Sequence, residues 1–159
     1  MGILSRLFGK QEPVQEAPQS EAESKDNKDL LWERISEIMA FGENQLKPEL
    51  VRAQQKKWVR ATFSDFRNSH IKIRDFRTKI ERETAKIEAV PMQSMIFQEY
   101  TRNIISMLKQ LNAQLKVAEN QLGGERNITE IANSLTLSVN SYDEVKDYWT
   151  NKVRKQFLE

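Results

Sequence analysis

Apolar residues recur every seven positions along one stretch of the chain, and this regularity limits the possible folds more than any other feature. In a second stretch, apolar side chains alternate at spacings of four and three residues. Both spacings place side chains on one face of an α-helix, and that face must be buried against other helices. The first set, here called the first seam, is Val59, Phe66, Ile73, Ile80 and Ile87. The second seam is Phe97, Thr101, Ile104, Leu108, Leu111, Leu115, Ala118 and Leu122.

Prolines set the expected limits of the helix that carries the first seam. Pro48 suits the first turn of a helix, and Pro91 ends it. A continuous helix over residues 49–90 would be about 63 Å long at 1.5 Å per residue. A helix of that length cannot bury its apolar face within one small chain, so we expect self-association through the two seams.

The remaining segments also predict helices. The first helix is expected to begin at Asp29 and to stop at Gly42, and Gly123 with Gly124 is expected to end the helix of the second seam. Beyond that point, two pairs have the spacing of helix N-terminal caps and predict two shorter helices. These pairs are Asn127 with Glu130 and Ser141 with Glu144.

Taken together, these patterns predict an all-α fold. No alternation of apolar and polar residues is long enough to require a strand. We expect an elongated helical bundle, or a long helical hairpin with two shorter C-terminal helices, over residues 29–159.

The composition excludes most enzyme classes. Among 159 residues there is no cysteine, one histidine (His70) and only five glycines. A thiolate nucleophile, a cysteine or histidine metal site and a glycine-rich phosphate loop are therefore excluded. We expect a non-enzymatic protein without cofactor or metal, in which His70 is a hydrogen-bonded interior or interface residue.

The first ten residues form an amphipathic peptide, here called the tip. Its apolar side chains Ile3, Leu4, Leu7 and Phe8 share one helical face, while Arg6 is basic. The tip resembles the amphipathic N-terminal anchors of bacterial peripheral membrane proteins and of membrane-remodelling coats of the phage-shock and ESCRT types. Burial of the four apolar side chains, with Arg6 facing anionic headgroups, predicts weak and reversible attachment to a membrane. The alternatives are docking in a groove of a protein partner or on the bundle of the chain itself.

Residues 11–28 are rich in Gln, Glu, Ser and Pro, and Val14 is the only sizeable aliphatic side chain among them. Such a composition cannot bury enough apolar surface to offset the entropy of ordering. We therefore expect a disordered tether between the tip and the helical core.

Basic residues are concentrated in the middle of the chain. Residues 46–90 contain 12 basic and 6 acidic side chains, a net charge of +6. One set, here called the basic line, follows the first seam: Lys56, Lys57, Arg60, Arg67, Arg74 and Arg77. It has three interpretations: the charged edge of a helix–helix interface, contact with an anionic membrane, or nucleic-acid binding.

These features predict a cytoplasmic scaffold or adaptor that works at the inner face of a membrane. Its core would form a homo-oligomer or bind a protein partner, and the tip would recruit it to a membrane surface or docking site. The alternative is a small helical nucleic-acid-binding subunit that uses residues 52–79.

Overall fold

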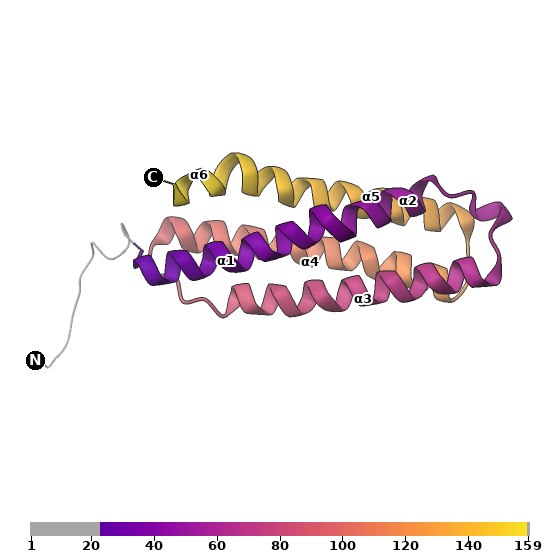
Figure 1. Ribbon diagram of the computed structural model, residues 1–159, viewed down its shortest axis with the longest axis horizontal. Coiled ribbons are helices and arrows are strands. Elements are labelled where there is room, and N and C mark those ends of the chain that lie inside the picture. Colours follow the sequence, from indigo (N-terminus) through magenta and orange to yellow (C-terminus); the bar gives the residue numbers. More distant parts are fainter. Residues whose placement is uncertain (1–22, 159) are drawn as a thin grey trace, which may run out of the picture.

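In the computed structural model, which describes residues 23–158, four long helical arms run alternately up and down along one axis (Figure 1). The first arm is α1 (Lys25–Phe41), a π-helical turn (Gly42–Leu46) and α2 (Lys47–Gln55). The second arm is α3 (Phe63–Glu88), and the third is α4 (Met95–Gly123). The fourth arm is α5 (Ile128–Tyr148), a second π-helical turn (Trp149–Val153) and α6 (Arg154–Phe157).

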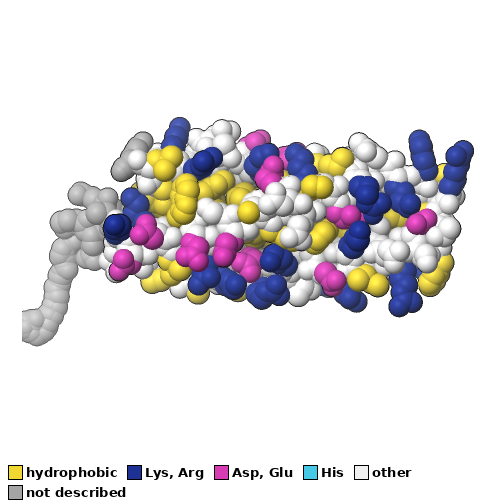
Figure 2. All heavy atoms as spheres, viewed as in Figure 1, with side chains coloured by type: hydrophobic (Ala, Val, Ile, Leu, Met, Phe, Trp, Pro, Cys, Tyr) yellow, Lys and Arg dark blue, Asp and Glu magenta, His cyan; other side chains and the backbone are white. Residues whose placement is uncertain are grey.

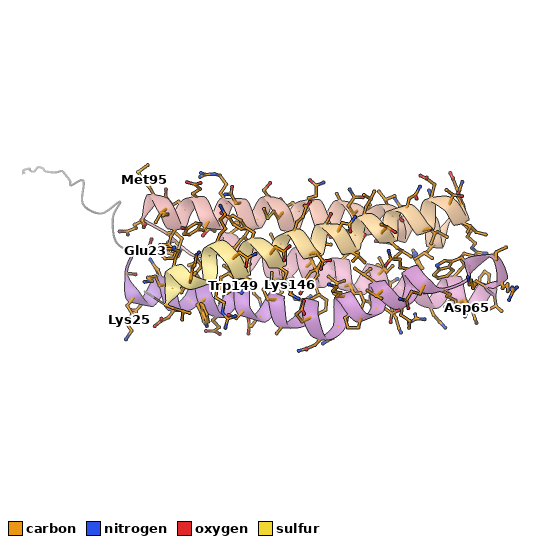
Figure 3. The ribbon with its side chains drawn as sticks, turned by 90° about the horizontal axis from the view of Figure 1, so that it is seen from above. Glu23, Lys25, Asp65, Met95, Lys146 and Trp149 are labelled. Atoms are coloured by element: carbon orange, nitrogen blue, oxygen red, sulfur yellow. The ribbon has the colours of Figure 1, made fainter. Side chains whose placement is uncertain are left out.

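The arms close around a shared apolar core. Helix α4 packs along both α3 and α5, and the first arm closes the bundle against α3 and α5. Figure 3 places Glu23, Lys25 and Met95 at one end and Asp65 at the other. The all-α prediction is confirmed, since residues 23–158 form a helical bundle and contain no strand.

Several predicted helix limits are also confirmed. Helix α4 ends at Gly123, and Pro91 lies in the connection after α3. The Asn127 side chain accepts a hydrogen bond from the backbone N–H of Glu130 and so caps the start of α5. The cap residue Asn127 thus sets the start of α5, and glycine sets the end of α4, as the sequence predicts.

The second seam is buried along its whole length, as the spacing predicts. Four members of the first seam, Phe66, Ile73, Ile80 and Ile87, are buried as well. The prediction for Val59 is wrong: 74% of its surface is exposed. Val59 lies seven residues before Phe66 and so fits the heptad spacing, but it precedes α3, which begins at Phe63.

The continuous helix predicted over residues 49–90 is also wrong. The chain leaves α2 at Lys56, forms a 3₁₀ turn at Trp58–Arg60 and enters α3 through a capping box. In that box, the Thr62 hydroxyl accepts from the Asp65 N–H, and the Asp65 carboxylate accepts from the Thr62 N–H. Because the chain reverses here, the first seam is buried within one chain, and helix length no longer argues for self-association.

The expected boundary between tether and core is four residues too late. Ser24 caps α1 by accepting from the Asn27 N–H, so residues 25–28 are helical. The Glu23 carboxylate accepts hydrogen bonds from the backbone N–H groups of Gln93 (2.6 Å) and Ser94 (2.8 Å) before α4. The tip and residues 11–22 lie outside the described residues.

The two shorter C-terminal helices are in fact one arm. Ser141 is buried in the middle of α5 and does not begin a helix. Continuous burial of Ile131, Leu135 and Val145 along α5 supplies the energy that keeps the helix unbroken across the second cap signal.

Helix α1 ends at Phe41, so Gly42 marks its end as expected, but the Gly42 backbone stays right-handed and the chain continues through the π-helical turn into α2. A close contact explains why a glycine stands here. An added Cβ at Gly42 would lie 2.2 Å from Cε1 of Tyr142, whose ring is buried between the first and fourth arms. The Tyr142 hydroxyl donates to Glu43 (2.5 Å), and this bond lowers the pKa of the Glu43 carboxyl. Burial, followed by the bond to Glu43, raises the pKa of Tyr142.

We expect Gly42→Ala to destabilise the bundle by about 1–2 kcal/mol, because overpacking against the Tyr142 ring exceeds the roughly 1 kcal/mol gained in helix propensity. Urea unfolding measures the change. In a Tyr142→Leu background, the same substitution should cost much less. An equal cost in both backgrounds would contradict this explanation.

Leu111 lies at the middle of the second seam and is 1% exposed. We expect Leu111→Ala to lower the free energy of unfolding by about 2–5 kcal/mol. On the same helix, Val117 is 42% exposed, and Val117→Ala should change stability by no more than about 0.5 kcal/mol. A loss below about 1 kcal/mol at Leu111 would show that the seam is not the core.

Candidate functional surfaces

The interior of the bundle is filled by aliphatic and aromatic side chains. Within residues 23–158, no group of three or more His, Cys, Asp or Glu side chains is placed to hold a metal ion. None of the helices in this part of the chain has the length and apolar character needed to cross a membrane. The candidate functional features therefore lie on the surface.

His70 links two helices. Its Nδ1 lies 2.9 Å from the backbone carbonyl oxygen of Glu119, to which it donates a hydrogen bond. The ring also lies against Gly123, where an added Cβ would approach Nδ1 to 2.5 Å. The half-buried His70 thus joins α3 to the end of α4, which agrees with the predicted role as a hydrogen-bonded interior or interface residue.

The basic line divides into paired and unpaired members. Arg77 donates to Glu119 on α4 (2.6 Å) and to Glu81 (3.0 Å), and the bond to Glu119 raises the pKa of Arg77. Lys56 pairs with Asp65 at 3.5 Å, and Arg74 pairs with Asp75. Arg77 belongs to the helix–helix interface, as the first interpretation of the line predicts.

The other three members, Lys57, Arg60 and Arg67, are exposed. They form no ion pair with any residue in the part of the chain that the structure describes. These cations lie at the end of the bundle that is remote from Glu23, where Figure 2 shows Lys and Arg side chains beside apolar ones.

We call this region the loop end: residues 56–67, together with Arg126 from the connection between α4 and α5. Trp58 anchors it, since its ring is buried against Phe66 and its indole N–H donates to the Ala53 carbonyl oxygen at 2.8 Å. Val59, within the 3₁₀ turn, is 74% exposed, and Phe63, the first residue of α3, is 62% exposed. The turn and the start of α3 thus hold two large apolar side chains outward.

Arg126 completes the loop end. Its guanidinium lies 4.7 Å from the centroid of the Phe63 ring and 5.4 Å from that of Phe66, within the range of cation–π attraction. Its backbone has a φ of 57°, in the left-handed region that non-glycine residues seldom adopt. The bond from its N–H to the Gln121 carbonyl oxygen (2.8 Å) helps to hold this conformation.

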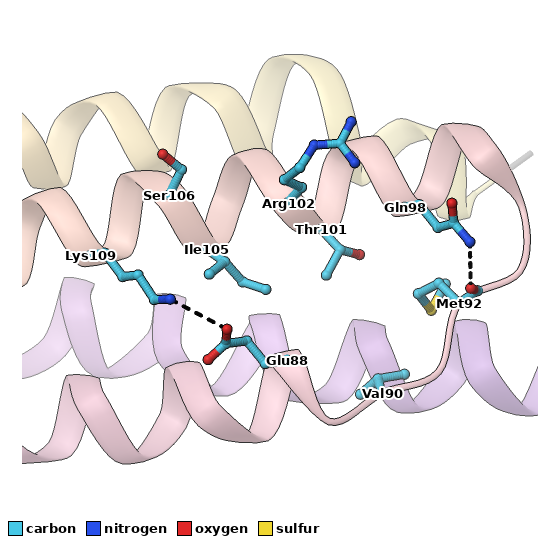
Figure 4. Close-up of a pocket in the computed structure, with 9 residues that line it drawn as sticks. All are labelled: Glu88, Val90, Met92, Gln98, Thr101, Arg102, Ile105, Ser106 and Lys109. Atoms are coloured by element: carbon cyan, nitrogen blue, oxygen red, sulfur yellow. Dashed lines mark hydrogen bonds and ion pairs between the residues drawn. The ribbon is translucent and has the colours of Figure 1, made fainter.

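A second surface is an open groove of about 550 Å³ between the end of α3 and the first half of α4 (Figure 4). Val90, Met92 and Ile105 supply its apolar lining. Its rim carries Arg102 and a Lys109–Glu88 ion pair of 3.4 Å. The groove lies beside the 89–94 connection, to which Glu23 is bonded.

Comparison with models of protein families, with curated proteins and with solved structures finds no match for this chain.

Sequence reasoning located the basic line but missed the partners that divide it. Phe63 is not a member of the first seam, and its exposure follows from the chain reversal at residues 56–62. No pattern points to Arg126, because its place depends on the fold of a connection after Gly123 and Gly124. The groove was missed because it combines a connection with a helix face.

The division of the basic line predicts different costs for two arginines. Arg77 is 15% exposed and bonded to Glu119, so Arg77→Ala should destabilise the bundle by about 1.5–3 kcal/mol. Arg67 is exposed and unpaired among the described residues, and Arg67→Ala should change stability by no more than about 0.5 kcal/mol. Thermal unfolding measures both. Equal losses would mean that the line acts as a single interface.

Proposed function

We propose that this protein is a non-enzymatic helical adaptor that is recruited to an anionic membrane surface through its tip. One observation carries the proposal. The buried apolar residues in the described part of the chain run from Leu31 to Val153, and the four arms cover one another's apolar faces. The described core closes without residues 1–22, and this supports a role for the apolar side chains of the tip in contact with another surface.

The place where the chain enters the bundle supports this function. Glu23 is bonded to the 89–94 connection, which fixes the exit of residues 1–22 at one end of the bundle. A chain of 22 residues spans at most about 70–80 Å when extended. The tip can therefore contact a surface while the bundle stays free to meet a partner.

A protein partner is the second element of the adaptor. The groove between α3 and α4 offers an apolar lining with Arg102 and Lys109 at its rim. An acidic amphipathic helix would bury its apolar side chains there and place a carboxylate near Arg102, since Lys109 is already paired with Glu88. Because the groove lies near the exit of residues 1–22, such a partner would be held close to the recruited end.

Replacing Leu4, Leu7 and Phe8 together by Ser should lower binding to vesicles that contain anionic lipid by at least tenfold, because apolar burial supplies most of the attachment. Co-sedimentation of the full chain measures this. Arg6→Glu should reduce binding only several-fold, since it mainly alters attraction to the headgroups.

Circular dichroism is the control, because helicity and melting should stay unchanged in both variants. Vesicle binding that is insensitive to the triple substitution would contradict the proposed role of the tip.

A further inference from the structure

We propose that the loop end is a second membrane-contact site, which binds an anionic lipid surface with Val59 and Phe63 in the headgroup region. Lys57, Arg60 and Arg67 would lie on the lipid phosphates around them. This site is independent of the tip, and its argument rests on residues 56–67 and Arg126 alone.

The first step is that a well-fixed backbone presents the two apolar side chains, Val59 from the 3₁₀ turn and Phe63 from the first residue of α3. The 3₁₀ turn is closed by hydrogen bonds from Arg60 N–H to the Lys57 carbonyl oxygen (3.0 Å) and from Ala61 N–H to the Trp58 carbonyl oxygen (3.1 Å). Trp58 fastens the turn to the core, and the capping box of Thr62 fixes the start of α3. Little ordering entropy is then lost when Val59 and Phe63 enter another phase.

The second step is the local charge. Residues 56–67 contain four cations and one carboxylate, Asp65, which pairs with Lys56. This leaves Lys57, Arg60 and Arg67 without ion pairs among the described residues. Each basic group near an anionic membrane strengthens binding about fivefold, as roughly 1 kcal/mol implies.

The third step is the choice of lipid over nucleic acid. Val59 is aliphatic and has no flat face on which a base could stack, and the Arg126 guanidinium lies over the Phe63 ring, where it competes with a base for that face. Exposed apolar side chains surrounded by cations instead match the interfacial region of an anionic bilayer. Burying each of these two side chains should strengthen binding about tenfold.

The loop end and the exit of residues 1–22 lie at opposite ends of the bundle. Helix α3 has 26 residues and is about 39 Å long, so the loop end lies roughly 40 Å from the end where residues 1–22 leave the bundle. Contact at both ends would join two surfaces or strengthen attachment to one of them.

The experiment uses the full chain with Leu4, Leu7 and Phe8 replaced by Ser, so that the tip does not contribute. We expect this parent still to bind vesicles of phosphatidylcholine with phosphatidylserine, and not vesicles of phosphatidylcholine alone. Adding Val59→Ser with Phe63→Ser should lower binding at least tenfold, and adding Lys57→Gln, Arg60→Gln and Arg67→Gln should do the same.

Two matched controls keep the effect specific. Val117→Ser with Leu137→Ser removes two exposed apolar side chains elsewhere on the bundle, and should leave binding within about twofold. Replacing the exposed residues Lys25, Lys116 and Lys155 by Gln removes the same charge, and should also have a small effect. Equal losses in control and loop-end variants would overturn the proposal.

Insertion can be observed directly, because the chain has no cysteine. A fluorophore sensitive to polarity, attached at Val59→Cys in the parent, should shift to shorter wavelength when anionic vesicles are added. The same label at Leu137→Cys should not shift. Absence of the shift at position 59 would overturn the site whatever the tip does, whereas failure of the tip variants in the full chain would contradict only the proposed function.

Nucleic acid provides the last test. If the three Gln substitutions abolish binding to a single-stranded oligonucleotide while the Val59 and Phe63 substitutions leave vesicle binding unchanged, the loop end is a polyanion site and the membrane proposal is overturned.

Discussion

Burial of the second seam on α4 is the interaction on which the rest of the structure depends. This helix packs against both α3 and α5, and Ile104, Leu108, Leu111 and Leu115 are each no more than 1% exposed. Removing four aliphatic side chains of this size from water contributes on the order of 6–12 kcal/mol before entropy is counted. Helices α3 and α5 are then positioned by the apolar faces that they pack against α4.

The first arm is added to this core by apolar packing and by polar contacts with α5. Besides the Glu43–Tyr142 bond, Lys47 pairs with Asp143 at 2.7 Å and Lys146 pairs with Glu43 at 3.0 Å. The pKa of Glu43 is lowered by its bond with Tyr142, so its contribution to stability is present above the ordinary carboxyl pKa. That contribution is lost as the pH falls through the lowered pKa, which weakens the attachment of this arm in acid.

Sequence periodicity predicted the helices and most of the core but not the chain reversal that makes them a bundle. Spacing defines which residues share a helical face, whereas the reversal depends on contacts that spacing does not contain. Trp58 must reach the Ala53 carbonyl oxygen, and Thr62 must cap α3. Val59 has the heptad spacing but does not belong to α3. Arg67 and Arg77 are both members of the basic line, but of these two only Arg77 forms an ion pair with a carboxylate on α4.

The loop end is the place where stability alone explains the sequence least well. Arg126 has a left-handed backbone, which costs on the order of 1–3 kcal/mol. Two apolar side chains point outward here, and three cations have no ion pair with any residue of the described part of the chain. A polar residue at Val59 would cost the bundle little, because that side chain contributes no burial to the core. Local choices that conflict with stability tend to mark functional surfaces. The strained Arg126 backbone, the exposed apolar side chains and the cations without ion pairs among the described residues all lie at one end of the bundle. We therefore infer that the loop end was selected for contact with another surface.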